Sequence, residues 1–322
     1  MLNETIAETT ADSLKGRNCP SCSGANLEAV LEAPDRFHGR TEVYRLVRCH
    51  SCELVWLDPA PPPEEMGYHY GSDYDKSVAQ ANAGSTKREL FRRRILTKYK
   101  QRGAVLDLGC SSGSFLNSLK GSDWALYGVE MSPTIAQIAR ERTGADIFVG
   151  DVLDAPFGAN TLDAVTCFHV LEHMYSPREI LAKISEWLKP GGVFVSFMPN
   201  IDSAGARIFR SYWYALELPR HLYHFSPKSL RILAQSVGLE EISVVTDREV
   251  FIEASTRYIL DDTFRKIGIN RTPLARAKQP GIPFRVVRKV FRISLLPVLN
   301  SLASLAGDGE SIHAIFRKGF SK

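Results

Sequence analysis

The fold is decided by residues 104–116, Ala-Val-Leu-Asp-Leu-Gly-Cys-Ser-Ser-Gly-Ser-Phe-Leu. An apolar run over 105–108 ends in a Gly-x-x-x-Gly turn, and an amphipathic segment follows. This order predicts a buried parallel strand, a tight turn and a helix. Gly109 and Gly113 allow backbone conformations that a side chain would forbid, and they leave space for a ligand. Asp107 falls at the carboxyl end of the strand, where open α/β sheets bind ligands.

Two further predicted strands end in an acid. The run 126–130 ends at Glu130, about 20 residues after the glycine turn, where a carboxylate can accept hydrogen bonds from both hydroxyls of a ribose. The run 147–151 ends at Asp151, which suits the amino group of an adenine. Ser111 breaks the Gly-x-Gly-x-x-Gly pattern that is typical of NAD binding. The three acids therefore favour a different ligand that contains adenosine.

Five ordered motifs over residues 85–246 resemble those of class I S-adenosylmethionine-dependent methyltransferases. They are Val105–Gly113, Gly128–Ser132, Gly150-Asp151, Phe168–His173 and Leu188–Gly192. The resemblance implies a Rossmann-like α/β fold whose seven-stranded sheet carries helices on both faces. The expected strands lie near 104–108, 125–130, 146–149, 162–168, 192–197, 241–246 and 311–318, and a helix is expected at 177–188.

The resemblance also implies which residues bind S-adenosylmethionine. Asp107 would orient the methionine amine, the turn would pack against the methionine, and Glu130 would hold the ribose. Phe168 would lie where the cofactor meets the acceptor. The full set of expected cofactor-binding residues is Asp107, Gly109, Cys110, Gly113, Glu130, Met131, Asp151, Val152 and Phe168.

An oxygen or carbon acceptor needs a group that removes its proton, and histidine can do this near neutral pH. The catalytic candidates are His169, at the end of the fourth strand, and His221 and His224, in the long loop after the fifth strand. His173 is interpreted as a structural histidine. The two loop histidines are favoured near the substrate, and hydrogen bonding within the loop is the alternative.

The six cysteines form two groups. The pairs Cys19/Cys22 and Cys49/Cys52 make two C-x-x-C knuckles, which predict a structural Zn²⁺ bound by four thiolates. A redox-active thiol set is the alternative, and His50 could replace one cysteine ligand. The remaining Cys110 and Cys167 fall inside the nucleotide-binding fold, where a small buried residue is expected at Cys167 rather than a nucleophile.

The sequence predicts a modular chain. The expected parts are a disordered tail at 1–16, a zinc ribbon at 17–58, a linker and lid at 59–84, and the methyltransferase domain at 85–322 with a helical insertion at 250–308. Tyr68, Tyr70 and Tyr74 either line the lid or pack between domains. The ribbon and the segment after it resemble the N-terminal part of bacterial methyltransferases from sugar and cell-surface polysaccharide pathways. Related sugar C-methyltransferases carry a further large domain that this chain is too short to hold.

Two basic segments stand out. In residues 86–100, a core stripe of Leu90, Phe91, Ile95 and Leu96 is expected, with the basic side chains on a solvated face or a nucleic-acid patch. Within 283–306, an apolar helix face beside a basic one is typical of contact with a membrane surface, and a dimer contact or a substrate cap is the alternative. The oligomeric state is left open.

Composition is that of an ordinary globular protein, with 44% hydrophobic and 24% charged residues among 322. The net charge of +4 is too small to argue for nucleic acid. No signal peptide is visible, so a cytoplasmic location is expected, peripheral at the inner membrane face if 283–306 binds lipid. The predicted function is methyl transfer to a small-molecule acceptor, a sugar or lipid-linked glycan. The alternative is an RNA methyltransferase that grips RNA with the ribbon and the basic helix.

Overall fold

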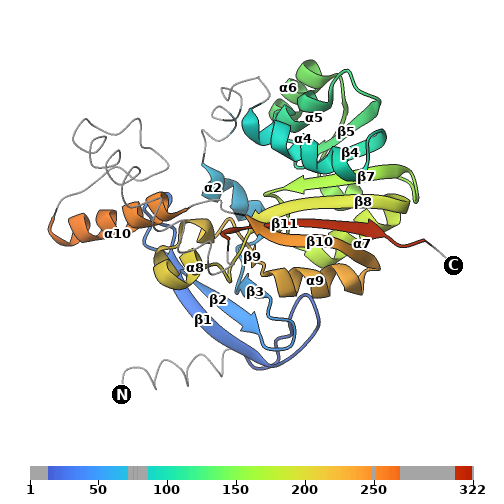
Figure 1. The fold of residues 1–322 in the computed structure, drawn as a ribbon. Coiled ribbons are helices and arrows are strands. Elements are labelled where there is room, and N and C mark those ends of the chain that lie inside the picture. Colours follow the sequence, from blue (N-terminus) through green and yellow to red (C-terminus); the bar gives the residue numbers. More distant parts are fainter. Residues whose placement is uncertain are drawn as a thin grey trace. The chain divides into compact units, whose positions relative to one another are not determined.

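The computed structural model describes residues 14–71, 75, 78, 86–247, 251–268 and 309–320. Its packing divides the chain into two units (Figure 1). Unit 1 contains residues 1–61, 199–230 and 245–312, and unit 2 contains residues 62–198, 231–244 and 313–322. Residues 199–230, which the sequence analysis assigned to the methyltransferase domain, thus group with the N-terminal cysteines.

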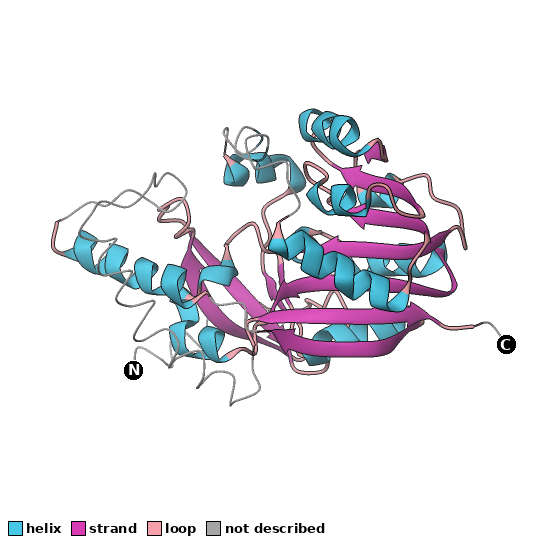
Figure 2. Ribbon diagram, turned by 45° about the horizontal axis from the view of Figure 1, so that its top comes forward, coloured by secondary structure: helices cyan, strands magenta, loops and turns pink. Residues whose placement is uncertain are grey.

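Unit 2 is built on a seven-stranded sheet with the strand order β10-β11-β8-β7-β4-β5-β6. Helices cover both faces of this sheet (Figure 2). The predicted α/β fold is therefore confirmed. Its strands are β4 (Gly103–Leu108), β5 (Trp124–Glu130), β6 (Asp146–Val149), β7 (Leu162–Phe168), β8 (Leu188–Pro199), β10 (Leu239–Asp247) and β11 (Ser311–Lys318).

The strand order places a switch point between β4 and β7. From β4 the chain runs outward through β5 and β6 on one side, and then returns to pair β7 with the other side of β4. All these pairs are parallel, so the carboxyl ends of the strands share one edge. Ligands bind open α/β sheets at this edge, where neighbouring connections diverge.

Apolar burial explains the central strands. In β4, Val105, Leu106 and Leu108 are fully buried, which accounts for the continuous apolar run in the sequence. The strand expected at 192–197 is longer, because β8 already pairs at Leu188 and resumes its register at Val193. The predicted helix at 177–188 forms over Pro177–Trp187.

The helices of unit 2 agree with the sequence analysis except for the buried face of α4 (Lys87–Tyr99). In the part that the structure describes, they are α2 (Met66–Tyr70), α4, α5 (Ser114–Leu119), α6 (Pro133–Thr143), α7 (Pro177–Trp187) and α9 (Pro227–Ser236), the last beginning in unit 1. In α4 the expected core stripe is wrong in part, since Leu90 is 50% and Phe91 42% exposed. The buried face carries Glu89, Arg92 and Leu96 instead, because this face of the helix packs polar groups against the site described below.

Unit 1 contains a four-stranded sheet with the order β1-β2-β3-β9. Its strands are β1 (Leu27–Pro34), β2 (Val43–Cys49), β3 (Val55–Leu57) and β9 (Tyr223–His224), and they pair antiparallel. Among the described residues, this unit also contains α8 (Ala204–Phe209) and α10 (Ile252–Lys266). The sheet therefore joins the N-terminal segment to a strand more than halfway along the chain.

The helical insertion expected at 250–308 is described only in its first part, where α10 forms. The amphipathic segment 283–306 and Tyr74 lie outside the described residues. None of the helices in the described part of the chain is long and apolar enough to cross a membrane.

Candidate functional site

The carboxyl end of β4 carries the first acid of the site. Asp107 is 4% exposed, and the hydroxyl of Thr166 on the neighbouring β7 donates a hydrogen bond of 2.7 Å to it. Burial raises the pKa of Asp107 to about 7, although the Thr166 hydrogen bond and the charge of Arg92 act in the opposite direction. A buried carboxyl of this kind favours a cationic partner, which would relieve the cost of its ionised form.

The two glycines of the turn are required by conformation and by packing. Gly109 and Gly113 have φ values of +60° and +74°, in the left-handed region. A Cβ atom on Gly109 would lie 2.6 Å from the side chain of Val170, so a larger residue would force this contact apart. Cys110 is buried beside Gly128, and burial raises the pKa of its thiol, so the thiolate form is disfavoured.

Glu130 at the end of β5 is tied to the glycine turn. Its two carboxylate oxygens accept hydrogen bonds of 3.0 Å from the backbone N–H groups of Ser111 and Ser132. Burial raises its pKa, and these two hydrogen bonds oppose the rise. The carboxylate is thus oriented by backbone, while each oxygen keeps a further lone pair for a ligand.

The third acid lies beside the second, because the N–H of Gly150 donates to the carbonyl of Glu130. Asp151 is exposed, and its Oδ1 accepts a hydrogen bond of 2.8 Å from the N–H of Leu153. Val152 is buried, whereas Met131 is 67% exposed. The structure therefore brings the three predicted acids to one sheet edge, with an exposed apolar side chain next to the second.

The end of β7 combines an aromatic cluster with a histidine. Phe168 makes edge-to-face contacts with Phe115 and Phe197, at centroid distances of 4.9 and 5.0 Å. His169 follows with a left-handed φ of +59°, and its N–H donates to the carbonyl of Phe197. Strained backbone of this kind is frequent at functional positions.

A buried carboxylate, that of Glu172, lies close to the ring of His169. Nδ1 of His169 lies 3.5 Å from Oε1 of Glu172, which is 1% exposed. Neither carboxylate oxygen of Glu172 has a hydrogen-bond partner. Leaving such oxygens unsatisfied costs free energy, so a carboxylate here is suited to orient or stabilise a neighbouring imidazolium.

The sequence analysis did not identify Arg92 as a site residue. Arg92 on α4 is 8% exposed, and its guanidinium lies 4.4 Å from the centroid of the Phe168 ring. Glu89, one turn earlier, approaches it with 3.6 Å between Oε1 and NH1. Arg92 and Glu89 share a helical face with the core residue Leu96, and this spacing was the available signal.

Three further histidines are named with His169 in the sequence analysis. His173 is within hydrogen-bond distance of Tyr70, with 3.2 Å between Nδ1 and the hydroxyl. His221 and His224 belong to unit 1, where both are buried. Nδ1 of His221 donates to the carbonyl of Ala215 at 2.9 Å. His169 directly follows Phe168, one of the expected cofactor residues, and the role of His221 and His224 stays a prediction.

Unit 1 carries the predicted metal centre. The four sulfur atoms of Cys19, Cys22, Cys49 and Cys52 all lie within 4.8 Å of one another. The closest pairs are 3.5 Å (Cys19–Cys52) and 3.6 Å (Cys22–Cys49) apart. Four thiolates around Zn²⁺ at about 2.3 Å would be separated by roughly 3.8 Å, so the cluster fits a closed tetrahedral site.

The backbone of the two knuckles follows the same pattern. Ser23 and Glu53, each next to the second cysteine of its knuckle, both have a φ of +61°. Their N–H groups donate to the carbonyls of Cys19 and Cys49, at 2.9 and 2.8 Å. The repeated turn directs two thiols from each knuckle at one point. The neighbouring thiol of Cys19 and burial both raise the pKa of Cys52, so its thiolate form is disfavoured. A bound cation would stabilise the thiolate.

Comparison with known proteins agrees with this geometry. Residues 74–244 match the family model described as "Methyltransferase domain". The mitochondrial ubiquinone biosynthesis O-methyltransferase of Schizosaccharomyces pombe is 26% identical over 162 residues, 48% of this chain and 56% of the relative. The corresponding enzyme of Xanthomonas axonopodis pv. citri is 29% identical over 148 residues, 42% of this chain and 62% of the relative. The chain thus spans less than two thirds of either relative.

Solved structures add support for the fold alone. A Bacillus halodurans protein described as a putative methyltransferase superposes with a TM-score of 0.51 at 15% identity, covering 73% of this chain and all of its own. The cyclase SpnF superposes with a TM-score of 0.52 at 16% identity, covering 81% of this chain and 98% of its own. A cyclase on the same fold shows that function must be argued from the site.

Proposed function

Because the chain belongs to the Methyltransferase domain family, we propose that it transfers the methyl group of S-adenosylmethionine to a hydroxyl of a small molecule, a sugar or a lipid-linked glycan. The observation that carries the proposal is the pair of His169 and Glu172 at the end of β7, next to the switch point of the sheet. A hydroxyl acceptor needs this kind of base, since its own proton is held tightly at neutral pH.

Three acids fit the parts of the cofactor. The buried carboxyl of Asp107 would receive the ammonium group, Glu130 would receive the ribose hydroxyls, and Asp151 would receive the adenine amino group. Arg92, close to Phe168, would attract the cofactor carboxylate, which no acid of the site could hold. When bound, the cofactor supplies a sulfonium whose methyl group is ready for displacement, so the protein mainly orients the two reactants.

His169 would accept the proton of the acceptor hydroxyl. With Nδ1–H directed at Glu172, the imidazole would present Nε2 as the basic atom. The buried Glu172 would then stabilise the imidazolium that forms. The packing of Phe168 among other aromatic rings fixes the end of β7 from which His169 extends.

The acceptor class rests on two lines of support. The ribbon and the segment after it resemble methyltransferases of sugar and polysaccharide pathways. The curated relatives named above are O-methyltransferases by description, which supports transfer to oxygen. The net charge of +4 and the burial of Arg92 give little support to the RNA alternative.

Replacing His169 with alanine tests the proposed base. The full chain is incubated with radiolabelled S-adenosylmethionine and a cell extract, and the label is followed in the glycan, glycolipid and RNA fractions. We expect label in the first or second fraction, and a rate about 100- to 10,000-fold lower for His169→Ala. His173→Ala is the matched control and is expected to keep most activity. Label in RNA, or an undiminished rate in His169→Ala, would contradict the proposal.

The pKa of Asp107 predicts how cofactor affinity changes with pH. This pKa is raised to about 7, so the carboxyl is mostly protonated at pH 6 and increasingly ionised above pH 7. An ammonium group pairs only with the ionised form, so binding should strengthen about eightfold from pH 6 to pH 7.5. Calorimetry at several pH values measures this change, and Asp107→Asn should bind weakly with little dependence on pH. An affinity of the native chain that does not vary with pH would refute the pairing.

A further inference from the structure

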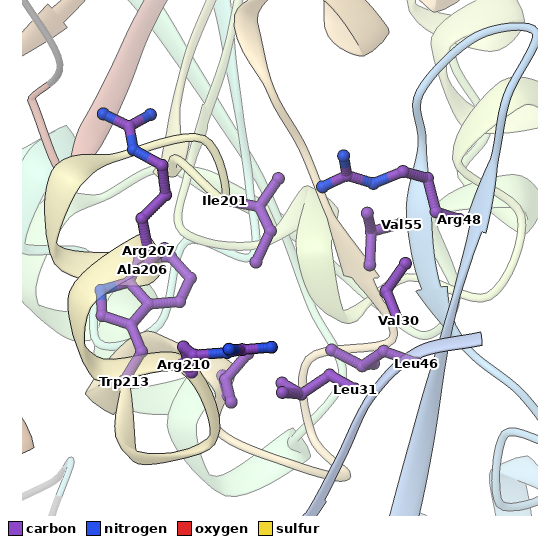
Figure 3. Close-up of a pocket in the computed structure, with 11 residues that line it drawn as sticks. Val30, Leu31, Leu46, Arg48, Val55, Ile201, Ala206, Arg207, Arg210 and Trp213 are labelled. Carbon is purple, nitrogen blue, oxygen red and sulfur yellow. The ribbon is translucent and has the colours of Figure 1, made fainter. Parts of the chain in front are cut away.

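A pocket of about 320 Å³ lies in unit 1, and none of its lining residues belongs to the site described above. It lies between the sheet strands β1 to β3 and the segment 201–216, and all of its lining residues belong to unit 1 (Figure 3). The volume is at the lower end of the range typical of small-ligand sites. Most of the wall is aliphatic, and Trp213 adds an aromatic surface.

Two arginines supply the charge. Arg48 on β2 and Arg210, just after α8, extend their guanidinium groups into the pocket from opposite sides (Figure 3). The third lining arginine, Arg207, directs its guanidinium away from this space and donates a hydrogen bond to the carbonyl of Asp202 (Figure 3). The pocket therefore has an apolar wall and two opposed cations.

The charge of these arginines is poorly neutralised. Arg48 forms a long ion pair with Asp202, at 3.9 Å between Nη2 and Oδ1, and the buried Nε of Arg48 has no hydrogen-bond partner among the described residues. Within the described residues, no ion pair or side-chain hydrogen bond engages Arg210. Donors left in this state are suited to an anion, which can accept hydrogen bonds from both sides.

The backbone is irregular at two points that face the pocket. The register of β1 against β2 shifts between Ala29 and Leu31, so Val30 is the extra residue of a β-bulge. Arg210 has a left-handed φ of +48°, which is unfavourable for a residue with a side chain. Bulges and strained residues of this kind occur often beside binding sites, where they redirect a side chain.

The far wall is held rigidly. Trp213 is 1% exposed, its Nε1 donates to Glu310 at 3.4 Å, and its ring contacts Phe251 at 6.3 Å. A fixed aromatic wall lowers the entropy lost when an apolar group binds against it.

We propose that unit 1 binds a small amphipathic anion in this pocket, with a phosphate or similar head group between Arg48 and Arg210 and an alkyl or prenyl tail against the apolar wall. Both halves are needed. The apolar wall gives no reason for two arginines whose guanidinium groups extend into the pocket, and a free phosphate would leave the wall exposed to water. The inference does not depend on methyl transfer, because none of these residues belongs to the site of unit 2.

Calorimetry with the full chain tests the proposal, with decyl phosphate below its micelle concentration as the probe. Decanol and inorganic phosphate are the comparison ligands, each lacking one half of the probe. We expect decyl phosphate to bind at least about tenfold more tightly than either. Arg210→Gln should lose about tenfold in affinity for decyl phosphate and keep its affinity for decanol.

Lys228→Gln is the matched control, since Lys228 is a cation of unit 1 that pairs with Glu53 outside the pocket. Its affinity should equal that of the native chain. Val30→Phe should fill the pocket and weaken both decyl phosphate and decanol, and circular dichroism of each variant confirms folding. Equal binding of decanol and decyl phosphate, equal losses in Arg210→Gln and Lys228→Gln, or binding only to vesicles that contain phosphatidic acid would overturn the proposal.

Discussion

Replacing Glu130 with alanine is expected to weaken S-adenosylmethionine binding by at least about 100-fold, equivalent to roughly 3 kcal/mol. The carboxylate would accept two charge-assisted hydrogen bonds from the ribose, and both are lost in the variant. The variant also loses two hydrogen bonds within the protein, because Glu130 accepts them from the backbone N–H groups of Ser111 and Ser132. Removing it frees the glycine turn, so the methionine end of the site is disturbed as well.

Two further variants make this result specific. Asp154 is an exposed acid at the same sheet edge, so Asp154→Ala changes the charge equally and should leave the affinity unchanged. The affinity of Asp151→Ala for the cofactor should lie between those of Glu130→Ala and Asp154→Ala, because this variant loses one hydrogen bond at an exposed position. Calorimetry measures all three, and far-ultraviolet circular dichroism checks the fold. A Glu130→Ala affinity within about threefold of the native value would contradict the assignment of this edge as the cofactor site.

Much of unit 2 could be predicted from sequence because its signals are local. A buried parallel strand is an apolar run, and the acids at Asp107, Glu130 and Asp151 come directly after such runs. Once the strands are parallel, their ends meet at one edge, so the three acids are brought together by the fold class alone. The strand bounds then agree closely, except at β8, where the Pro-Gly-Gly segment lies within the strand.

The face of α4 could not be predicted in the same way. Apolar residues normally mark the buried face of a helix, so the sequence predicts that Leu90 and Phe91 belong to the core. The structure buries Glu89 and Arg92 instead, because that face meets the cluster around Phe168. The burial of this pair depends on Phe168, which is distant in sequence, so the helical spacing of Glu89, Arg92 and Leu96 could not by itself show which face is buried.

The sheet and the pocket of unit 1 could not be predicted either, because they depend on contacts between segments that are distant in sequence. The sheet pairs Val55 with His224, and nothing in either segment specifies the other. The pocket depends on the bulge at Val30 and on the backbone at Arg210, both of which arise from tertiary packing. The cysteine spacing, in contrast, predicted the cluster directly, because two short turns fix the geometry of each thiol pair.

Replacing Cys19 with serine is expected to abolish zinc binding and to destabilise unit 1. Binding of zinc by four thiolates contributes on the order of 10 kcal/mol to the folding of small metal domains, and a serine hydroxyl is a poor substitute for a thiolate. Cys19 is 2% exposed, and the variant also leaves three thiols, of which Cys49 and Cys52 are buried, without the cation that would hold them ionised. Elemental analysis should find about one zinc per native chain and close to none in the variant. Differential scanning calorimetry should show a large fall in the unfolding temperature of unit 1.

The contrast between the two units gives this prediction its control. Cys167→Ser also removes a buried thiol, but Cys167 lies in β7 of unit 2, so its zinc content should stay at the native value. The cofactor affinity of Cys19→Ser is a second control, because unit 2 contains the residues expected to hold the cofactor and none of the four thiols. Cys19→Ser should therefore lose zinc while its affinity for S-adenosylmethionine changes little. Native zinc content in Cys19→Ser would refute the tetrathiolate site, and loss of zinc together with cofactor binding would instead show that the cluster supports both units.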